Sequence, residues 1–165
     1  MNKVPGNIKK YLTSCFLLTI PIIAWNIFLT GKLPVPFQPA IFGNNIPVLV
    51  TVGEQLSRVL IFALTLLMPL EIKSRAGIMI YLAGVLLYFS SWLALICYPH
   101  SAWSNSLLGF LAPALTPALW LTGIAITGNR FYFDLPYRRW IFLTVSLAFL
   151  IFHNTHTAIV YNRMH

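Results

Sequence analysis

Four side chains that can exchange protons or bind charged groups occur as two close pairs in an otherwise apolar chain. Glu54 and Arg58 are four residues apart, and His153 and His156 are three residues apart. On a helix, either spacing places the two side chains on the same face. Glu54 and the two histidines are therefore candidate catalytic residues for acid/base chemistry near neutral pH, and Arg58 is a candidate for binding an anionic group.

Each pair also has a simpler interpretation. Glu54 and Arg58 can neutralise each other along one helix, which lowers the free-energy cost of burying both charges. The histidines can join helices through hydrogen bonds, or they can contribute to a metal or haem site. A lone His-x-x-His spacing is a weak metal signature, because it lacks the acidic neighbour found in the zinc-protease helix. The sequence therefore assigns no metal ligand and leaves any cofactor unknown.

Other polar side chains are predicted to lie at a similar depth and to complete a binding site. Counted from the end of each predicted helix nearest the basic residues, the four ionisable residues fall at about 18 to 24 Å. By the same count, three polar residues on two other helices fall at about 20 to 23 Å, namely Asn26, Ser90 and Ser91. Thr116 lies between two prolines of the fourth predicted helix, whose missing amides leave backbone carbonyls without their usual partners. The polar turn between the third and fourth predicted helices contributes His100 and Trp103. The predicted substrate-binding residues are Arg58, Asn26, Ser91, His100, Trp103 and Thr116.

The composition excludes an ordinary water-soluble domain. Of the 165 residues, 58% are hydrophobic and 8% are charged, whereas soluble domains usually carry about 25% charged residues. The formal charge of +8 is divided among segments separated by long apolar runs, so it does not predict a nucleic-acid-binding patch. We predict an all-α integral membrane protein, with residues 1–165 as one domain. Its five transmembrane helices are expected at about 11–30, 49–70, 77–98, 106–127 and 140–161.

The basic residues also predict an orientation. Most of them fall on one side of the predicted bundle, and an excess of Lys and Arg is typical of the cytoplasmic side. The N-terminus is therefore expected to be cytoplasmic and the C-terminus extracytoplasmic, in the cytoplasmic membrane of a bacterium. The residues on the basic side are Lys3, Lys9, Lys10, Lys73, Arg75, Arg130, Arg138 and Arg139.

Several local patterns predict how the helices pack. Three helices carry a polar face, including one formed by Glu54 and its helical neighbours. Segment 31–48 is apolar and rich in proline, so it is not expected to form a regular helix; it predicts either a hairpin on the outer surface or a lid over a cavity. Pro113 and Pro117 predict a kink. A close packing seam is predicted along one side of the third helix by Gly77, Tyr81, Gly84, Tyr88 and Ser91.

Three functions are compatible with these features. The first is a membrane protein that binds or converts a lipophilic small molecule in a polar pocket of the outer leaflet, by isomerisation, cyclisation or hydrolysis. The second is a proton-coupled permease for small solutes, although five spans without visible repeats are not typical of transporters. The third is an accessory or assembly subunit whose polar faces contact other chains. The sequence leaves open whether the protein is an enzyme, and it is compatible with assembly into homo- or hetero-oligomers.

Overall fold

The computed structural model describes residues 13–71, 74–132 and 139–164. In these ranges the regular secondary structure is helical, apart from an isolated bridge between Ser14 and Pro69. Five helical segments are long and apolar enough to cross a membrane, as the sequence predicted, and this indicates an integral membrane protein. They are Cys15–Lys32, Val48–Leu67, Arg75–Cys97, Leu107–Thr127 and Arg139–Met164.

The first span is a succession of short helical pieces. It consists of the 3-10 helix η1 (Cys15–Leu18), α2 (Ile20–Leu29) and the 3-10 helix η2 (Thr30–Lys32). The predicted start at residue 11 lies outside the described residues. The chain before η1 is held by backbone hydrogen bonds of 2.8 Å from Cys15 N to Met68 O and from Leu70 N to Thr13 O.

The second span, α4 (Val48–Leu67), ends three residues earlier than predicted. The reason is Pro69, because a proline disfavours the helical conformation in the residue before it. Met68 accordingly has an extended conformation, with φ −99° and ψ 122°. This early end frees the backbone of Met68 and Leu70 for the pairing with the start of the first span.

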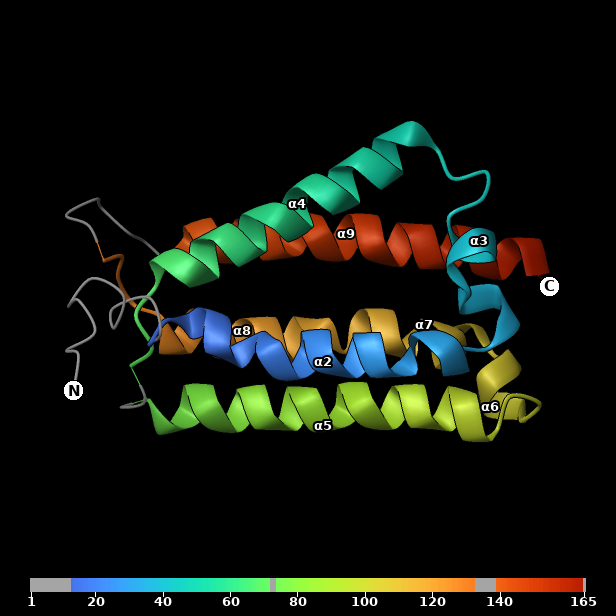
Figure 1. The fold of residues 1–165 in the computed structure, drawn as a ribbon, viewed down its shortest axis with the longest axis horizontal. Coiled ribbons are helices and arrows are strands. Elements are labelled where there is room, and N and C mark those ends of the chain that lie inside the picture. The colour runs from blue at the N-terminus through green and yellow to red at the C-terminus, as the bar shows by residue number, and fades with distance from the viewer. Residues whose placement is uncertain (1–12, 72–73, 133–138, 165) are drawn as a thin grey trace, which may run out of the picture.

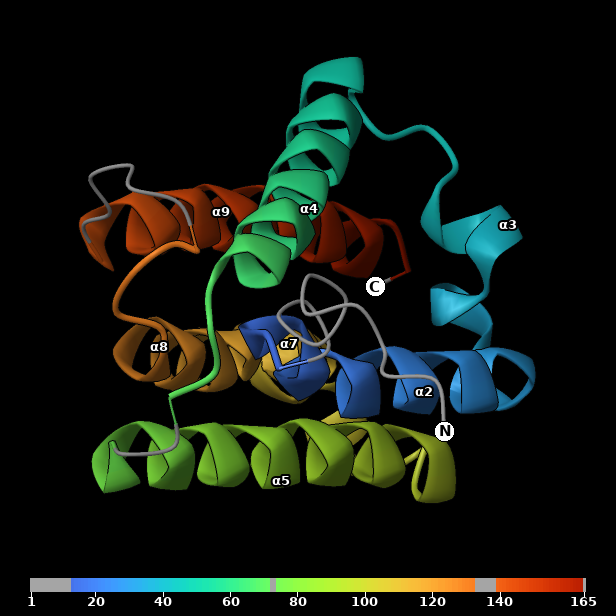
Figure 2. The ribbon, with the colours of Figure 1, turned by 60° about the vertical axis from the view of Figure 1, so that its left-hand side comes forward.

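Helix α4 lies against the last span, α9 (Arg139–Met164), and the two helices cross at an angle (Figures 1 and 2). The buried face of α4 is largely polar and contains Glu54, Ser57, Ile61 and Thr65. Its opposite face exposes apolar side chains such as Val59, as expected for a helix in contact with lipid. The predicted polar face is thus confirmed, and it points into the bundle rather than away from it.

The third span, α5 (Arg75–Cys97), packs closely on α8 (Pro117–Thr127). A Cβ atom on Gly84 would lie 2.9 Å from the backbone carbon of Leu119, so only glycine permits this approach. The hydroxyl of Tyr81 donates a 2.7 Å hydrogen bond to the carbonyl of Leu18. The predicted packing seam is therefore confirmed, and its tyrosines extend beyond it to the first span.

Helix four is interrupted where the two prolines predicted a kink. It is divided into α7 (Leu107–Leu115) and α8, with Thr116 between them, and the short helix α6 (Ala102–Asn105) precedes it. The Thr116 hydroxyl lies 3.5 Å from the carbonyl of Pro113, which the missing amide of Pro117 leaves free. The side-chain amide of Asn154 on α9 donates a 3.1 Å hydrogen bond to the carbonyl of Ala114.

The proline-rich connection between α2 and α4 folds back over the bundle at the end that carries the C-terminus (Figure 1). It contains the 3-10 helix η3 (Val35–Phe37) and the single helical turn α3 (Pro39–Phe42). Phe37 is only 8% exposed and packs against Leu95, Phe110 and Val160. The connection is therefore anchored in the core by an aromatic side chain, which favours the predicted lid over a hairpin lying on the surface.

Candidate functional site

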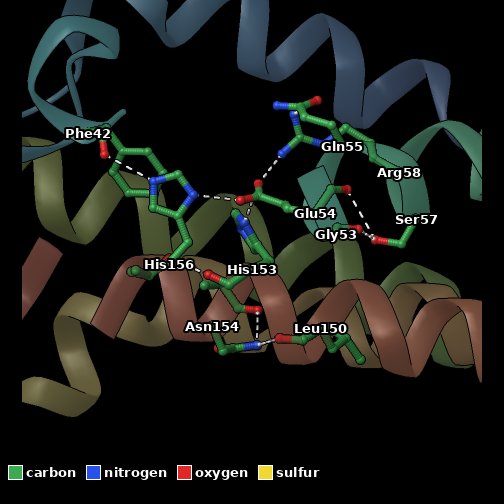
Figure 3. A network of polar contacts seen from close by, with 12 residues as sticks. Phe42, Gly53, Glu54, Gln55, Ser57, Arg58, Leu150, His153, Asn154 and His156 are labelled. Carbon is green, nitrogen blue, oxygen red and sulfur yellow. Dashed lines mark hydrogen bonds and ion pairs between the residues drawn. The ribbon is translucent and has the colours of Figure 1, made fainter. Parts of the chain in front are cut away.

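Glu54 is the centre of a buried polar cluster that joins the two pairs of ionisable residues (Figure 3). Its side chain forms an ion pair with Arg58 one turn along α4. Across the contact with α9, its Oε1 lies 3.0 Å from His153 Nδ1 and its Oε2 lies 2.6 Å from His156 Nδ1. Glu54 itself is only 2% exposed. The packing of α4 on α9 thus brings together residues that are about a hundred positions apart in the sequence.

Aromatic side chains and a backbone carbonyl fix both histidine rings. His153 stacks on Phe149 at 5.1 Å between ring centroids, and His156 stacks on Phe42 at 4.2 Å. The Nε2 of His156 also lies 3.0 Å from the backbone carbonyl oxygen of Phe42. A ring that is stacked on one side and hydrogen-bonded through both nitrogens has a defined orientation, so His156 links the cluster to the lid.

A cavity of about 330 Å³ lies beside this cluster. Arg58 and His153 belong to its lining, whereas Glu54 and His156 do not. Most of the lining is apolar. The volume of the cavity falls within the range of about 300 to 1,000 Å³ that is typical of small-molecule pockets. The cavity therefore combines apolar walls with an arginine and a histidine that both contact a buried carboxylate.

The walls of the cavity come from all five spans and from the lid. Leu33, Phe37, Pro39 and Phe42 contribute the lid side. Figures 1 and 2 show that α2 and α4 diverge toward the end of the bundle that carries α3, and both helices contribute lining residues. The Arg58 side chain is 38% exposed, so the cluster is accessible from outside the bundle on this side.

One further predicted substrate-binding residue, Asn26 on α2, lies at the cavity. Its Oδ1 accepts a 2.5 Å hydrogen bond from the hydroxyl of Tyr88, and both residues are part of the lining. Tyr88 was predicted as a residue of the packing seam. It is buried in that seam, and its hydroxyl also extends to α2 at the cavity.

The other four predicted substrate-binding residues are not part of this lining. Ser91 is buried, but its hydroxyl donates to the carbonyl of Tyr88 on the same helix. His100 and Trp103 are exposed at the turn before helix four. The hydroxyl of Thr116 is directed to the carbonyl of Pro113, while Pro113 itself lines the cavity. Helical depth alone therefore did not distinguish these residues from those that line the cavity.

Several residues that shape the site have little or no signal in the amino-acid sequence. Phe42 contributes through its backbone carbonyl, and any residue type has one. Trp92 and Trp120 contribute large apolar surfaces whose direction depends on the rotation of α5 and α8. The spacing of Thr157 from His153 places both residues on the polar face of α9. Thr157 could therefore have been included among the predicted binding residues, because it lines the cavity.

Among the residues that the structure describes, no group of three His, Cys, Asp or Glu side chains is arranged to hold a metal ion. The cluster instead uses the Nδ1 atoms of both histidines in contacts with Glu54. Cys15 is buried and Cys97 is exposed, and both are free thiols. The described geometry therefore fits proton transfer or anion binding more directly than metal coordination.

The fold and the site define a helical bundle of the membrane-spanning type, with a Glu-Arg-His-His cluster beside an apolar cavity. No known protein family, curated protein or solved structure matched the chain when it was compared with them.

Arg163 near the end of α9 is expected to hold the lid in place. Its guanidinium donates hydrogen bonds to the backbone carbonyls of Ile41, at 3.1 Å, and Asn44. Hydrogen bonds from charged groups contribute about 1.5 to 3 kcal/mol. Arg163→Ala should therefore increase amide hydrogen exchange in residues 38–46 by roughly tenfold or more, as measured by mass spectrometry. Arg75→Ala, an exposed change at the opposite end, is the control, and equal exchange in both variants would contradict this role.

Proposed function

We propose that this protein binds a lipophilic small molecule in the cavity between α2, α4 and α9. The observation that carries the proposal is the position of Arg58 and His153, which line a mostly apolar cavity and also contact the buried carboxylate of Glu54. Apolar walls with a few fixed polar groups are the usual composition of such a site. The polar end of the molecule is placed against Arg58 and His153, and its apolar part against the walls.

The proposed route of entry is sideways, from the surrounding lipid. Helices α2 and α4 diverge beside the cavity, and their outer surfaces expose apolar residues such as Ile27, Phe28 and Leu56. The distribution of Lys and Arg predicts that this end of the bundle lies on the extracytoplasmic side. Entry from the outer leaflet of a bacterial cytoplasmic membrane follows from these two features.

The same cluster is suited to acid/base conversion of the bound molecule. His153 faces Glu54 with Nδ1, so its Nε2 is the nitrogen left for a substrate. A carboxylate that orients an imidazole in this way is a common arrangement for general acid/base catalysis. Within the proposal, His153 transfers the proton to or from the substrate, and Arg58 orients the substrate. Glu54 and His156 keep the His153 ring in position and stabilise the charge that it gains. Isomerisation, cyclisation and hydrolysis are the reaction classes that this set can serve.

The burial of the polar faces supports this proposal over an accessory subunit. An assembly surface would have to present its polar residues outward. In this chain Ser57 and Thr65 on α4, and Ser146 and Thr157 on α9, are buried within the bundle itself. These faces are largely covered, whereas the exposed surface of α4 is mostly apolar and suited to lipid.

The proposal predicts that a lipophilic molecule is retained by the protein after gentle extraction. Native mass spectrometry should detect it on the wild type, and His153→Leu should reduce its occupancy at least about tenfold, as expected when a polar contact of about 1.4 kcal/mol or more is lost. His100→Leu replaces an exposed histidine outside the cavity and should retain it. Folded wild-type protein without any bound molecule, or equal occupancy in the two variants, would count against the proposal.

A further inference from the structure

The hydrogen bonds around His156 fix how many protons this part of the cluster holds. A carbonyl oxygen only accepts hydrogen bonds, so the 3.0 Å contact between His156 Nε2 and the Phe42 carbonyl requires a hydrogen on Nε2. A neutral imidazole carries a single N–H. In the neutral ring, this hydrogen bond to Phe42 therefore leaves Nδ1 without a hydrogen.

The other nitrogen of the ring faces an acceptor as well. His156 Nδ1 lies 2.6 Å from Glu54 Oε2, and two bare acceptors do not approach so closely without a proton between them. The pair therefore holds one additional proton, either on the imidazole beside a carboxylate or on the carboxyl beside a neutral imidazole. In both arrangements Glu54 and His156 together have no net charge.

This proton count leaves the positive charge of Arg58 uncompensated, even though Arg58 forms an ion pair with Glu54. The other carboxylate in the described residues, Glu71, lies at the opposite end of the bundle and pairs with Arg130 at 3.0 Å. The other described cations at the Arg58 end, Lys32 and Arg163, add positive charge there. A partly buried charge normally has a counter-charge. In the described part of the chain, no protein group supplies one for Arg58.

Among the described residues, the lining of the cavity itself contains no negative group. Arg58 is among the lining residues, whereas neither Glu54 nor Glu71 is. The cavity therefore offers a charged donor, and its described lining lacks an acidic side chain.

We propose that the molecule bound in the cavity is a single-chain amphiphile with an anionic head group, a carboxylate or a phosphate monoester, bound by Arg58. This inference deepens the proposed function and rests on it. The planar guanidinium matches the two oxygens of either head group. The head group supplies the missing negative charge, and the apolar walls contact the hydrocarbon chain.

Four probes with twelve carbon atoms each test this inference: dodecanoate, dodecyl phosphate, dodecanol and dodecylamine. Their binding to the full-length protein, washed free of lipid in detergent, is measured by isothermal titration calorimetry. At least one anionic probe should bind about ten- to a hundredfold more tightly than dodecanol, as expected for a charge-assisted hydrogen bond. Comparison of the two anionic probes identifies the preferred head group.

Matched arginine variants then locate the anion site. Arg58→Gln should remove the preference for an anionic probe, and Arg130→Gln, which removes an arginine at the opposite end, should leave it unchanged. A preference that survives in Arg58→Gln, or disappears equally in Arg130→Gln, would overturn the assignment to Arg58. If Arg58→Gln does not fold, Arg58→Lys is used in its place. Lysine lacks the planar guanidinium, so the preference for an anionic probe over dodecanol should decrease. An unchanged preference in Arg58→Lys would overturn the proposed contact between the guanidinium and the head group.

The probes also separate this inference from the proposed function. If dodecanol or dodecylamine binds the wild type as tightly as both anionic probes, the anionic head group is wrong, while a cavity for lipophilic molecules stands. If none of the four probes binds to protein whose folded state is verified by circular dichroism, both the head-group inference and the proposed function are wrong.

Discussion

Glu54→Ala is expected to lower the unfolding free energy by about 3 to 5 kcal/mol, the range found when one partner of a buried ion pair is removed. The Glu54 carboxylate forms an ion pair with Arg58 and lies within hydrogen-bond distance of His153 and His156. Alanine would leave these groups without their common acceptor. The change is measured as a shift in unfolding by sodium dodecyl sulfate in mixed micelles.

A combined variant separates the structural role of the cluster from its functional role. Replacing Glu54, Arg58, His153 and His156 together with leucine removes the charges at the same time. Replacement of a complete buried ionic group by apolar residues is often neutral or stabilising. The combined variant should therefore recover much of the stability lost in Glu54→Ala, while binding of the retained molecule is lost.

The matched control for this prediction is Glu71→Ala. Glu71 also pairs with an arginine, but its partner Arg130 is 70% exposed, and exposed ion pairs contribute only about 0 to 1 kcal/mol. Equal destabilisation by Glu54→Ala and Glu71→Ala would contradict the central position of Glu54. A combined variant that still binds the molecule would show that the cluster is not the binding determinant.

Gly84→Leu is expected to destabilise the protein by more than about 3 kcal/mol, above the 1 to 3 kcal/mol that is usual for overpacking. A Cβ at this position would lie 2.9 Å from the backbone carbon of Leu119 and equally close to the Leu119 Cβ. Backbone cannot rotate away as a flexible side chain can, so α5 and α8 would have to separate. The readout is the yield of monodisperse protein and its thermal unfolding temperature in detergent.

Gly31→Leu is the matched control for the seam. A Cβ on Gly31 meets no atom within 4 Å, so this variant tests the same change of residue type in open space. It should retain the yield and unfolding temperature of the wild type. Similar losses in the two variants would indicate that leucine itself, rather than the close approach of α5 and α8, causes the effect.

Much of the architecture follows from local physics and was predictable. Uncharged stretches of sufficient length specify five helices, because a buried backbone in lipid must satisfy its own hydrogen bonds. The interruption of the fourth span follows from the missing amides of Pro113 and Pro117. The end of α4 was predicted at residue 70 and lies at Leu67, because the effect of Pro69 on its neighbour outweighed the apolar character of the segment.

The candidate site was predictable only in part. The spacing of the ionisable residues identified the polar faces of α4 and α9, and these faces do meet at Glu54, His153 and His156. Depth along a helix did not predict which other polar residues reach the cavity. Ser91 has a suitable depth, but its hydroxyl is satisfied by its own helix, a local hydrogen bond that depth does not reveal.

The sequence by itself determined the number of membrane-length helices and the side of α4 and α9 that carries polar groups, because these properties depend on residue spacing along a single helix. Only the tertiary structure decided that both His Nδ1 atoms meet the same carboxylate, and that the Phe42 carbonyl binds the far side of His156. These contacts depend on the crossing of α4 and α9 and on the path of the lid. Both are set by packing between segments distant in the chain, for which spacing along one helix contains no information.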